Sequence, residues 1–198
     1  MTLPYEDNPM PHVLSVQCPD CKHEAVFEFS ECVRIRRTHD IKYFKASPMF
    51  EHKKASNRDG QGVNLACYYH KLTQHTLPEI SDLPDGYSMA DWEHSSYMYR
   101  PYEFDAGTVI CRSCGLRRKH NLSWPSDSYF QIHHKQQILW AFDRESAVEI
   151  LDFIRSKNRD RSKYKYRSFL LKIPPQFLDK KVRDVVAKRL SARLLAKT

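Results

Sequence analysis

The sequence predicts an α+β protein, in which a β-rich core is split by a long irregular insertion and followed by a helical, basic C-terminal part. Two Cys-x-x-Cys pairs are each flanked by short apolar runs typical of strands, an aromatic and turn-rich segment separates them, and helical periodicity dominates the end of the chain. We therefore expect one domain over residues 1–125 with a subdomain inserted at about 38–106, and a C-terminal strand and helices over residues 126–198.

The composition indicates a folded, soluble chain. Of the 198 residues, 41% are hydrophobic and 12% are aromatic, which is too much for an intrinsically disordered sequence. No run approaches the roughly 18 uninterrupted apolar residues of a membrane-spanning helix. The first residues lack the basic and apolar regions of a secretory signal. We expect a cytoplasmic protein with no membrane partner.

The charge is distributed unevenly along the chain. The formal net charge is +8 at pH 7, and residues 155–198 hold fifteen Lys or Arg against three Asp. The preceding 154 residues hold 17 basic and 21 acidic side chains. A basic C-terminal end favours an anionic partner, nucleic acid before membrane. The alternative is a solvated basic face that only keeps the protein soluble.

The two cysteine pairs predict a metal site. Cys18 and Cys21 form the first pair, and Cys111 and Cys114 form the second. Two residues between the sulfurs let one tight turn direct both thiolates at a single ion, as tetrahedral zinc requires. Gly115 follows the second pair and supplies the positive φ that such a turn often needs, whereas Lys22 takes this place in the first pair. We expect one structural Zn²⁺ held by all four cysteines.

These two turns resemble those of the zinc-ribbon family, in which two hairpins close one four-cysteine site. The resemblance covers about residues 12–37 and 107–124, and it implies zinc much more specifically than it implies a function. The chain departs from the family in the 89 residues that separate the pairs (residues 22–110). A zinc ion that crosslinks so long a loop constrains the unfolded chain strongly.

The six cysteines could also form disulfides, a redox pair or a second metal site. Disulfides need an oxidising compartment, and a redox Cys-x-x-Cys needs only one pair on a βα unit, so zinc is favoured for the paired cysteines. Cys32, Cys67, His70 and His75 form a second candidate metal site, although an isolated cysteine is more often a small buried hydrophobe.

Two basic stretches next to the cysteine pairs are candidate phosphate contacts. Residues 33–37 alternate apolar and basic side chains, as a half-buried strand does, and residues 117–120 are similarly basic. If both strands leave neighbouring hairpins, they border the metal site together. Part of this charge would offset the net negative charge of a zinc tetrathiolate. The residues expected to bind nucleic acid here are Arg34, Arg36, Arg37, Arg117, Arg118 and Lys119.

The insertion is rich in aromatic residues. Its stretch from 51 to 62 is polar, contains two glycines and predicts a loop. The aromatic side chains can stack on unpaired bases, but they more often build a core, and we expect a core here. They are Tyr43, Phe44, Phe50, Tyr68, Tyr69, Tyr87, Trp92, Tyr97, Tyr99, Tyr102 and Phe104.

The C-terminal part predicts a short strand over 137–142 and two amphipathic helices. Asp143 is placed to cap the first helix, with an apolar stripe of Ala147, Val148, Ile150, Leu151 and Ile154. The last helix is expected to begin at about Gln176, with an apolar stripe of Leu178, Val182, Val185, Val186, Leu190 and Leu194 and a basic remaining surface. Between the helices, the expected phosphate contacts are Arg159, Arg161, Lys163, Lys165 and Arg167.

These patterns favour a non-enzymatic nucleic-acid-binding protein, an accessory subunit of a larger complex that contacts DNA or RNA. The alternative is an adaptor whose basic last helix docks on an acidic protein partner. Phosphate-binding glycine motifs and a zincin motif are missing from the sequence. A metal-dependent nuclease built on His120, His133 and His134 is less favoured, because no carboxylate accompanies them.

Overall fold

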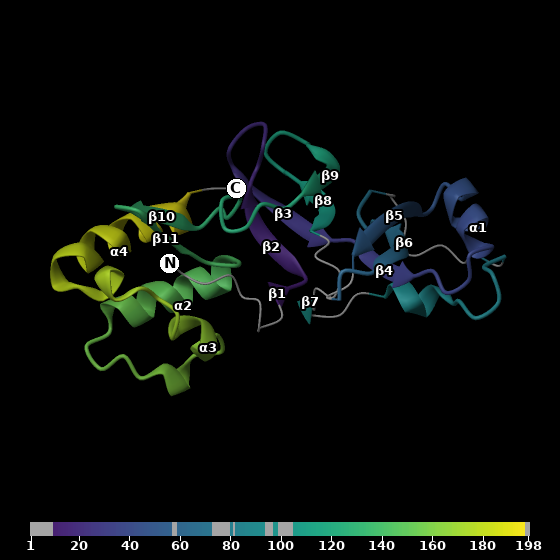
Figure 1. Cartoon of the computed structure of the whole chain (residues 1–198). Coiled ribbons are helices and arrows are strands. Elements are labelled where there is room, and N and C mark those ends of the chain that lie inside the picture. Colours follow the sequence, from purple (N-terminus) through teal and green to yellow (C-terminus); the bar gives the residue numbers. More distant parts are fainter. Residues whose placement is uncertain are drawn as a thin grey trace.

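A computed structural model gives the architecture of residues 10–56, 59–72, 80, 82–93, 97–98 and 105–196. It contains antiparallel sheets and helices, which confirms the α+β prediction. A four-stranded sheet lies in the middle of the molecule, the insertion lies at one end, and the C-terminal helices lie at the other (Figure 1). No helix among the described residues is long and apolar enough to cross a membrane.

The central sheet, here the first sheet, consists of β2 (Val13–Gln17), β3 (Glu24–Phe29), β8 (Ala106–Ile110) and β9 (Arg117–Asn121), in the order β2-β3-β8-β9. β2 and β3 form one hairpin and β8 and β9 the other. β3 and β8 are distant in sequence but pair directly, with Phe27 opposite Val109. Since both of these side chains are fully buried, their packing joins the two hairpins into one sheet.

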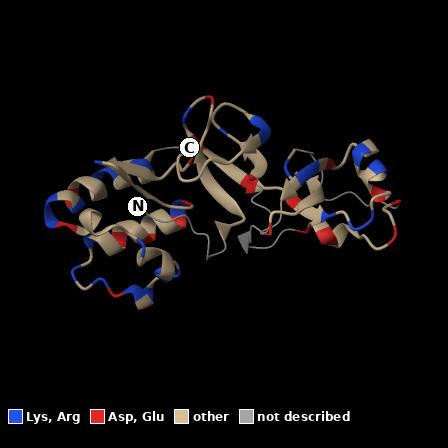
Figure 2. Ribbon diagram, viewed as in Figure 1, with Lys and Arg blue, Asp and Glu red and all other residues tan. Residues whose placement is uncertain are grey.

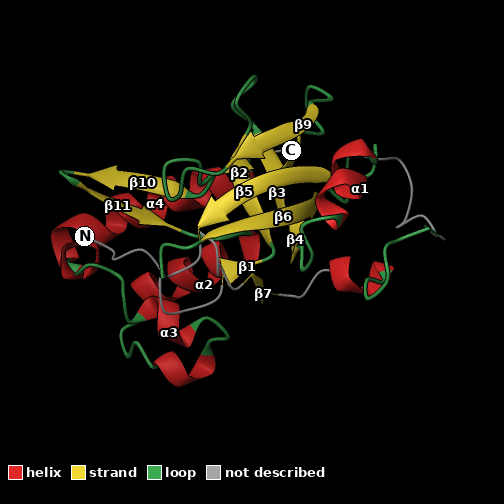
Figure 3. Ribbon diagram, turned by 45° about the vertical axis from the view of Figure 1, so that its right-hand side comes forward, coloured by secondary structure: helices red, strands yellow, loops and turns green. Residues whose placement is uncertain are grey.

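The insertion forms a second sheet of β4 (Glu31–Arg34), β6 (Gly62–Tyr68) and β5 (Glu51–Ser56), in the order β4-β6-β5. A helix, α1 (Asp40–Ala46), and a 3₁₀ turn, η1 (Met89–Trp92), pack beside it (Figure 3). The second sheet therefore begins at Glu31, and the boundary of the inserted subdomain at about residue 38 stays a prediction. The prediction of a loop over 51–62 is wrong for the first half of this segment, because β5 pairs along its whole length with β6.

Aromatic side chains of the insertion form its core, as expected. Phe44, Phe50 and Trp92 pack edge to face or tilted, with ring centroids 4.7–5.9 Å apart. The buried Trp92 indole donates to the carbonyl of Ala66 over 2.9 Å, which satisfies its only polar atom. Tyr68 is buried in this cluster, Tyr43 and Tyr87 border it, and Tyr69 belongs to a neighbouring cluster. Tyr99, Tyr102 and Phe104 lie outside the described residues, as does the side chain of Tyr97.

The C-terminal part packs on the first sheet. Its regular elements are the hairpin β10 (Gln131–His134) and β11 (Gln137–Trp140), the helices α2 (Arg144–Arg155), α3 (Arg167–Leu170) and α4 (Lys180–Leu195), and the 3₁₀ turns η2 (Arg161–Lys163) and η3 (Pro175–Leu178). One hydrophobic cluster joins Leu14 and Phe27 of the first sheet to Ile150 of α2 and Leu190 of α4. A short pair, β1 (Met10–Pro11) with β7 (Tyr97–Met98), completes the described strands.

The helix boundaries agree with the sequence for α2 and differ for α4. Asp143 caps α2, and its carboxylate accepts from the backbone N–H of Ser146 over 2.7 Å. α4 begins at Lys180 instead of Gln176, because the preceding turn is a separate 3₁₀ element and Asp179 caps the helix. Val148 and Val185 were expected in the apolar stripes but are about half exposed (51% and 50%), since neither faces the shared core.

Candidate metal centre and basic surfaces

The backbone shapes both cysteine turns in the same way. In the first hairpin, the N–H of Cys18 donates to His23 O (2.8 Å) and the N–H of Lys22 donates to Cys18 O (3.1 Å). The equivalent bonds in the second hairpin join Cys111 to Leu116 (2.9 Å) and Gly115 to Cys111 (3.0 Å). Both turns require a left-handed residue, and φ is +65° at Lys22 and +75° at Gly115. The matched turns direct the cysteine side chains of both hairpins to one point.

The four sulfurs are close enough together to hold one metal ion. Their Sγ atoms all lie within 4.8 Å of one another. The Sγ atoms of Cys18 and Cys114 are 3.7 Å apart, and those of Cys21 and Cys111 are 3.5 Å apart. A tetrahedral ion with metal–sulfur bonds of about 2.3 Å places its sulfurs about 3.8 Å apart. The cluster therefore has the dimensions of a tetrathiolate metal site, and all four cysteines are free thiols.

The surroundings of the cluster shift the pKa values of its thiols in different directions. Burial raises the pKa of the Cys111 thiol, but hydrogen bonds from the backbone of Cys114, from the Cys21 thiol and from the backbone of Ser113 outweigh it and lower the pKa to about 7. A backbone hydrogen bond from His23 lowers the pKa of Cys21, yet burial and the three neighbouring sulfurs together raise it to about 12. Four such sulfurs cannot all ionise without a cation between them, as expected of a metal-binding cluster.

The two basic stretches near the cysteine pairs lie in different sheets. Arg117, Arg118 and Lys119 belong to β9 of the first sheet. Arg34 ends β4 of the second sheet, and Arg36 and Arg37 follow it. The expectation that residues 33–37 form a strand leaving the first cysteine hairpin is therefore wrong, because β3 ends at Phe29 and the chain then pairs with β6.

Several of these cations already have partners inside the molecule. Lys119 pairs with Glu51 of β5, and its ammonium lies 4.4 Å from the centre of the Tyr69 ring. Arg118 pairs with Asp20 at 3.3 Å, and Arg36 donates to Gly86 O over 3.0 Å. Lys119 thus joins the first sheet to the second, a role that the sequence alone did not suggest.

The predicted contacts between the C-terminal helices are also partly occupied. Arg159 is half-buried and donates to the carbonyl of Leu178 over 2.9 Å. Lys165 pairs with Glu145 of α2 at 2.7 Å. Arg161, Lys163 and Arg167 are exposed and form no ion pair with any acidic side chain in the described ranges.

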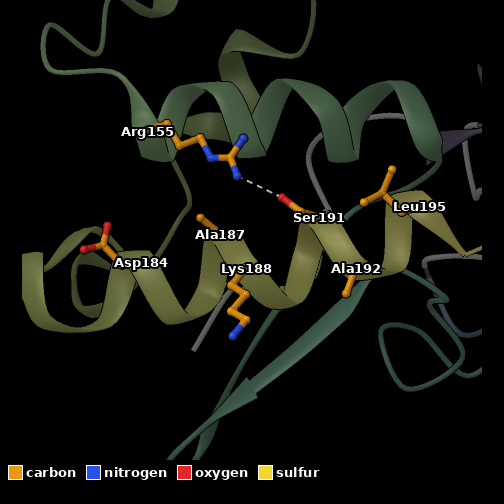
Figure 4. Close-up of a pocket in the computed structure, with 7 residues that line it drawn as sticks. All are labelled: Arg155, Asp184, Ala187, Lys188, Ser191, Ala192 and Leu195. Atoms are coloured by element: carbon orange, nitrogen blue, oxygen red, sulfur yellow. Dashed lines mark hydrogen bonds between the residues drawn. The ribbon is translucent and has the colours of Figure 1, made fainter.

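The last helix exposes a group of basic residues beside two shallow grooves. The first groove, of about 460 Å³, lies between α2 and α4 (Figure 4). In it, the Arg155 guanidinium donates to Ser191 Oγ over 3.0 Å, and Lys188 points away from α2. Asp184 also lines this groove, so its charge is mixed.

The second groove, of about 440 Å³, lies between β10 and α4 and has no acidic lining residue. Arg189 and Arg193, one helical turn apart, border it together with the exposed His133. The first guanidinium donates to the carbonyl of His133 (3.3 Å), and the second lies 5.1 Å from the centre of the Tyr129 ring. These contacts hold both cations in place, although Arg189 is exposed and Arg193 is only half-buried. Basic residues recur along α4 in the ribbon coloured by charge (Figure 2).

The second candidate metal site lies partly outside the described residues. Cys32 and Cys67 lie opposite each other in the second sheet, but His75 falls outside the described residues. Within the part of the chain that the structure describes, the four-cysteine cluster is the only group of three or more such ligands. Comparisons with known protein families, with curated proteins and with solved structures give no match for this chain.

Proposed function

We propose that the protein is a zinc-ribbon protein that binds nucleic acid without an enzymatic activity, as an accessory subunit of a larger complex. Zinc is proposed for the metal centre because four thiolates at tetrahedral spacing are its preferred structural ligands. Such a donor set leaves no position open for water, so the role proposed for the ion is structural.

The observation that carries the nucleic-acid proposal is the second groove. Its two arginines are held in place by neighbouring groups, and no acidic residue lines the groove. Lys188 is exposed on the same helix, and no described acidic side chain pairs with it. One guanidinium group can donate two parallel hydrogen bonds to the oxygens of a phosphate. Arginine side chains are therefore suited to bind a nucleic-acid backbone. The expected contacts are independent of base sequence.

One observation favours the second candidate, an adaptor that docks on an acidic protein partner. α4 exposes Val185 (50%) and Leu195 (81%) close to its basic residues. Apolar side chains among cations suit a protein surface better than a phosphate backbone. A protein partner would cover these residues, whereas nucleic acid would leave them in water.

A salt titration of binding tests the first candidate. The full-length protein is expected to bind random-sequence DNA or RNA at low salt, with affinity falling steeply as salt rises. Changing Lys188, Arg189 and Arg193 to glutamine together should reduce the slope of log K against log salt by about two to three for duplex DNA, and lower the affinity by roughly ten- to a hundredfold. Fluorescence anisotropy measures both quantities.

A variant with the same change in charge is the control for this experiment. Lys42, Lys45 and Lys54 are exposed residues of α1 and β5, which lie at the other end of the molecule from α4 (Figure 1). Changing them to glutamine should leave binding nearly unchanged. An equal loss in both variants would mean that only net charge matters. If the wild type binds no nucleic acid at low salt, the nucleic-acid proposal is rejected and the adaptor proposal remains. In that case the α4 variant should lose binding to the acidic protein partner, and the control variant should keep it.

A further inference from the structure

Two cysteines outside the metal centre face each other across the second sheet. Cys32 of β4 and Cys67 of β6 are directly opposite in the antiparallel register, and their Sγ atoms are 2.8 Å apart. Three positions along the strands, the N–H of Ile35 donates to Asn64 O, so Ile35 and Asn64 form a hydrogen-bonded pair of the antiparallel ladder. Hydrogen-bonded and non-hydrogen-bonded residue pairs alternate along antiparallel strands. Cys32 and Cys67 therefore form a non-hydrogen-bonded pair, the type in which side chains approach most closely.

This geometry suits a disulfide. A non-hydrogen-bonded pair has Cα atoms about 4.5 Å apart, within the range of about 4.4–6.8 Å that a disulfide spans. The sulfurs need to approach by less than about 1 Å to reach a bonding distance of about 2.05 Å. Both are free thiols, and neither belongs to the four-cysteine cluster.

The two thiols differ in their access to solvent. Cys67 is fully buried, whereas Cys32 is half-buried at the outer strand of the sheet. The hydrogen bond with Cys32 and its own burial raise the pKa of the Cys67 thiol. An oxidant would therefore meet Cys32 first, and Cys67 is placed to complete the bond.

The pair lies at the junction between the insertion and the first sheet. Ser30, next to β4, hydrogen-bonds through its N–H and its hydroxyl to the carbonyl of Ala106 in β8, and its hydroxyl is 3.5 Å from the Cys32 sulfur. On the other side of Cys67, the register places Glu51, which pairs with Lys119 of β9. A bond between the two sulfurs would thus fix the row of residues that connects the two sheets.

We propose that Cys32 and Cys67 form a reversible disulfide by exchange with a low-molecular-weight disulfide such as oxidised glutathione. The Cys32 thiolate attacks one sulfur of the oxidant, which forms a mixed disulfide and releases one thiolate. Cys67 then attacks the Cys32 sulfur, forms the intramolecular bond and displaces the second thiolate. The two cysteines lose two electrons and two protons, and the oxidant is reduced to two thiols.

The test uses the full-length protein with its metal bound. It is equilibrated in glutathione buffers of increasing oxidised fraction, quenched with acid, alkylated under denaturing conditions, digested and analysed by mass spectrometry, with metal content measured in parallel. We expect a linked peptide pair containing Cys32 and Cys67 and unchanged metal stoichiometry. We also expect hydrogen exchange in β4 and β6 to slow by roughly tenfold or more on oxidation, because the bond closes the intervening loop.

Two variants separate this pair from the metal ligands. Cys32→Ser should leave Cys67 free and alkylated at every glutathione ratio, and Cys67→Ser should stop Cys32 at the mixed disulfide. The proposal is overturned if both thiols remain alkylated in fully oxidised buffer. It is also overturned if crosslinks form only after the metal is lost and involve the cysteines of the metal centre.

Discussion

Replacing Cys111 with serine is expected to abolish metal binding at the four-cysteine cluster and to unfold the first sheet. Cys111 is buried, and its sulfur lies within 4.8 Å of the other three, so the substitution removes one of the four thiolates and leaves a three-sulfur site that binds an ion more weakly. Structural zinc contributes about 10–16 kcal/mol of apparent binding free energy in small zinc-finger peptides at pH 7, whereas a whole domain is stable by only about 5–15 kcal/mol. Loss of the ion is therefore expected to cost most of the stability.

The measurements are metal content by elemental analysis and urea unfolding followed by circular dichroism. Ser113→Ala is the matched control, because Ser113 is exposed in the same turn and is not a ligand; it should keep one metal ion per chain. A chelator should reproduce the effect of Cys111→Ser, and acidification should release the ion, since protons compete for the thiolates. A wild-type protein purified without stoichiometric metal, or a Cys111→Ser variant of unchanged stability, would contradict the assignment.

The metal centre is the part of the structure that the sequence predicts best. A Cys-x-x-Cys turn is a local feature, and its spacing, its flanking apolar runs and Gly115 all lie within a few residues. The same holds for the Asp143 cap of α2, whose hydrogen bonds reach only three residues along the chain. Local chemistry of this kind needs no knowledge of the tertiary fold.

The second sheet could not be predicted in the same way. β5 contains Glu51, Lys53 and Lys54, and an exposed edge strand with such residues lacks the apolar alternation of a buried one. Its pairing with β6 and the salt bridge between Glu51 and Lys119 join residues distant in sequence, and no short pattern reveals such contacts. Lys119 was accordingly predicted as a phosphate contact, although within the fold it joins two sheets.

Position also decides which basic residues of the last helix are available for a partner. The sequence places cations over most of α4 and cannot distinguish those that face the core from those that border a groove. Arg189 and Arg193 share one groove because they lie one helical turn apart and β10 packs beside them. The only sequence signal was their spacing of four residues, which any amphipathic helix offers many times.

The second large effect is expected at Gly107, where Gly107→Ala should destabilise the protein by about 3 kcal/mol or more. Gly107 is buried in the central strand β8, opposite Phe29 of β3. A Cβ atom there would lie 2.2 Å from the carbonyl oxygen of Glu28 and 2.5 Å from the Phe27 ring. The ring could turn aside only at the expense of the shared core, and the carbonyl belongs to the β3 backbone, so β3 and β8 would have to separate.

Gly62→Ala is the matched control, since nothing lies within 4 Å of a Cβ at this position, and its effect should be close to zero or slightly stabilising. Urea unfolding of both variants, with metal content measured on the same samples, compares them directly. Adding Phe27→Leu to Gly107→Ala should recover only part of the loss, because the leucine relieves the contact with the ring and leaves the contact with the Glu28 carbonyl. If Gly107→Ala were as stable as Gly62→Ala, β3 and β8 could not be adjacent strands. The two cysteine hairpins would then have no shared sheet to hold their sulfurs together.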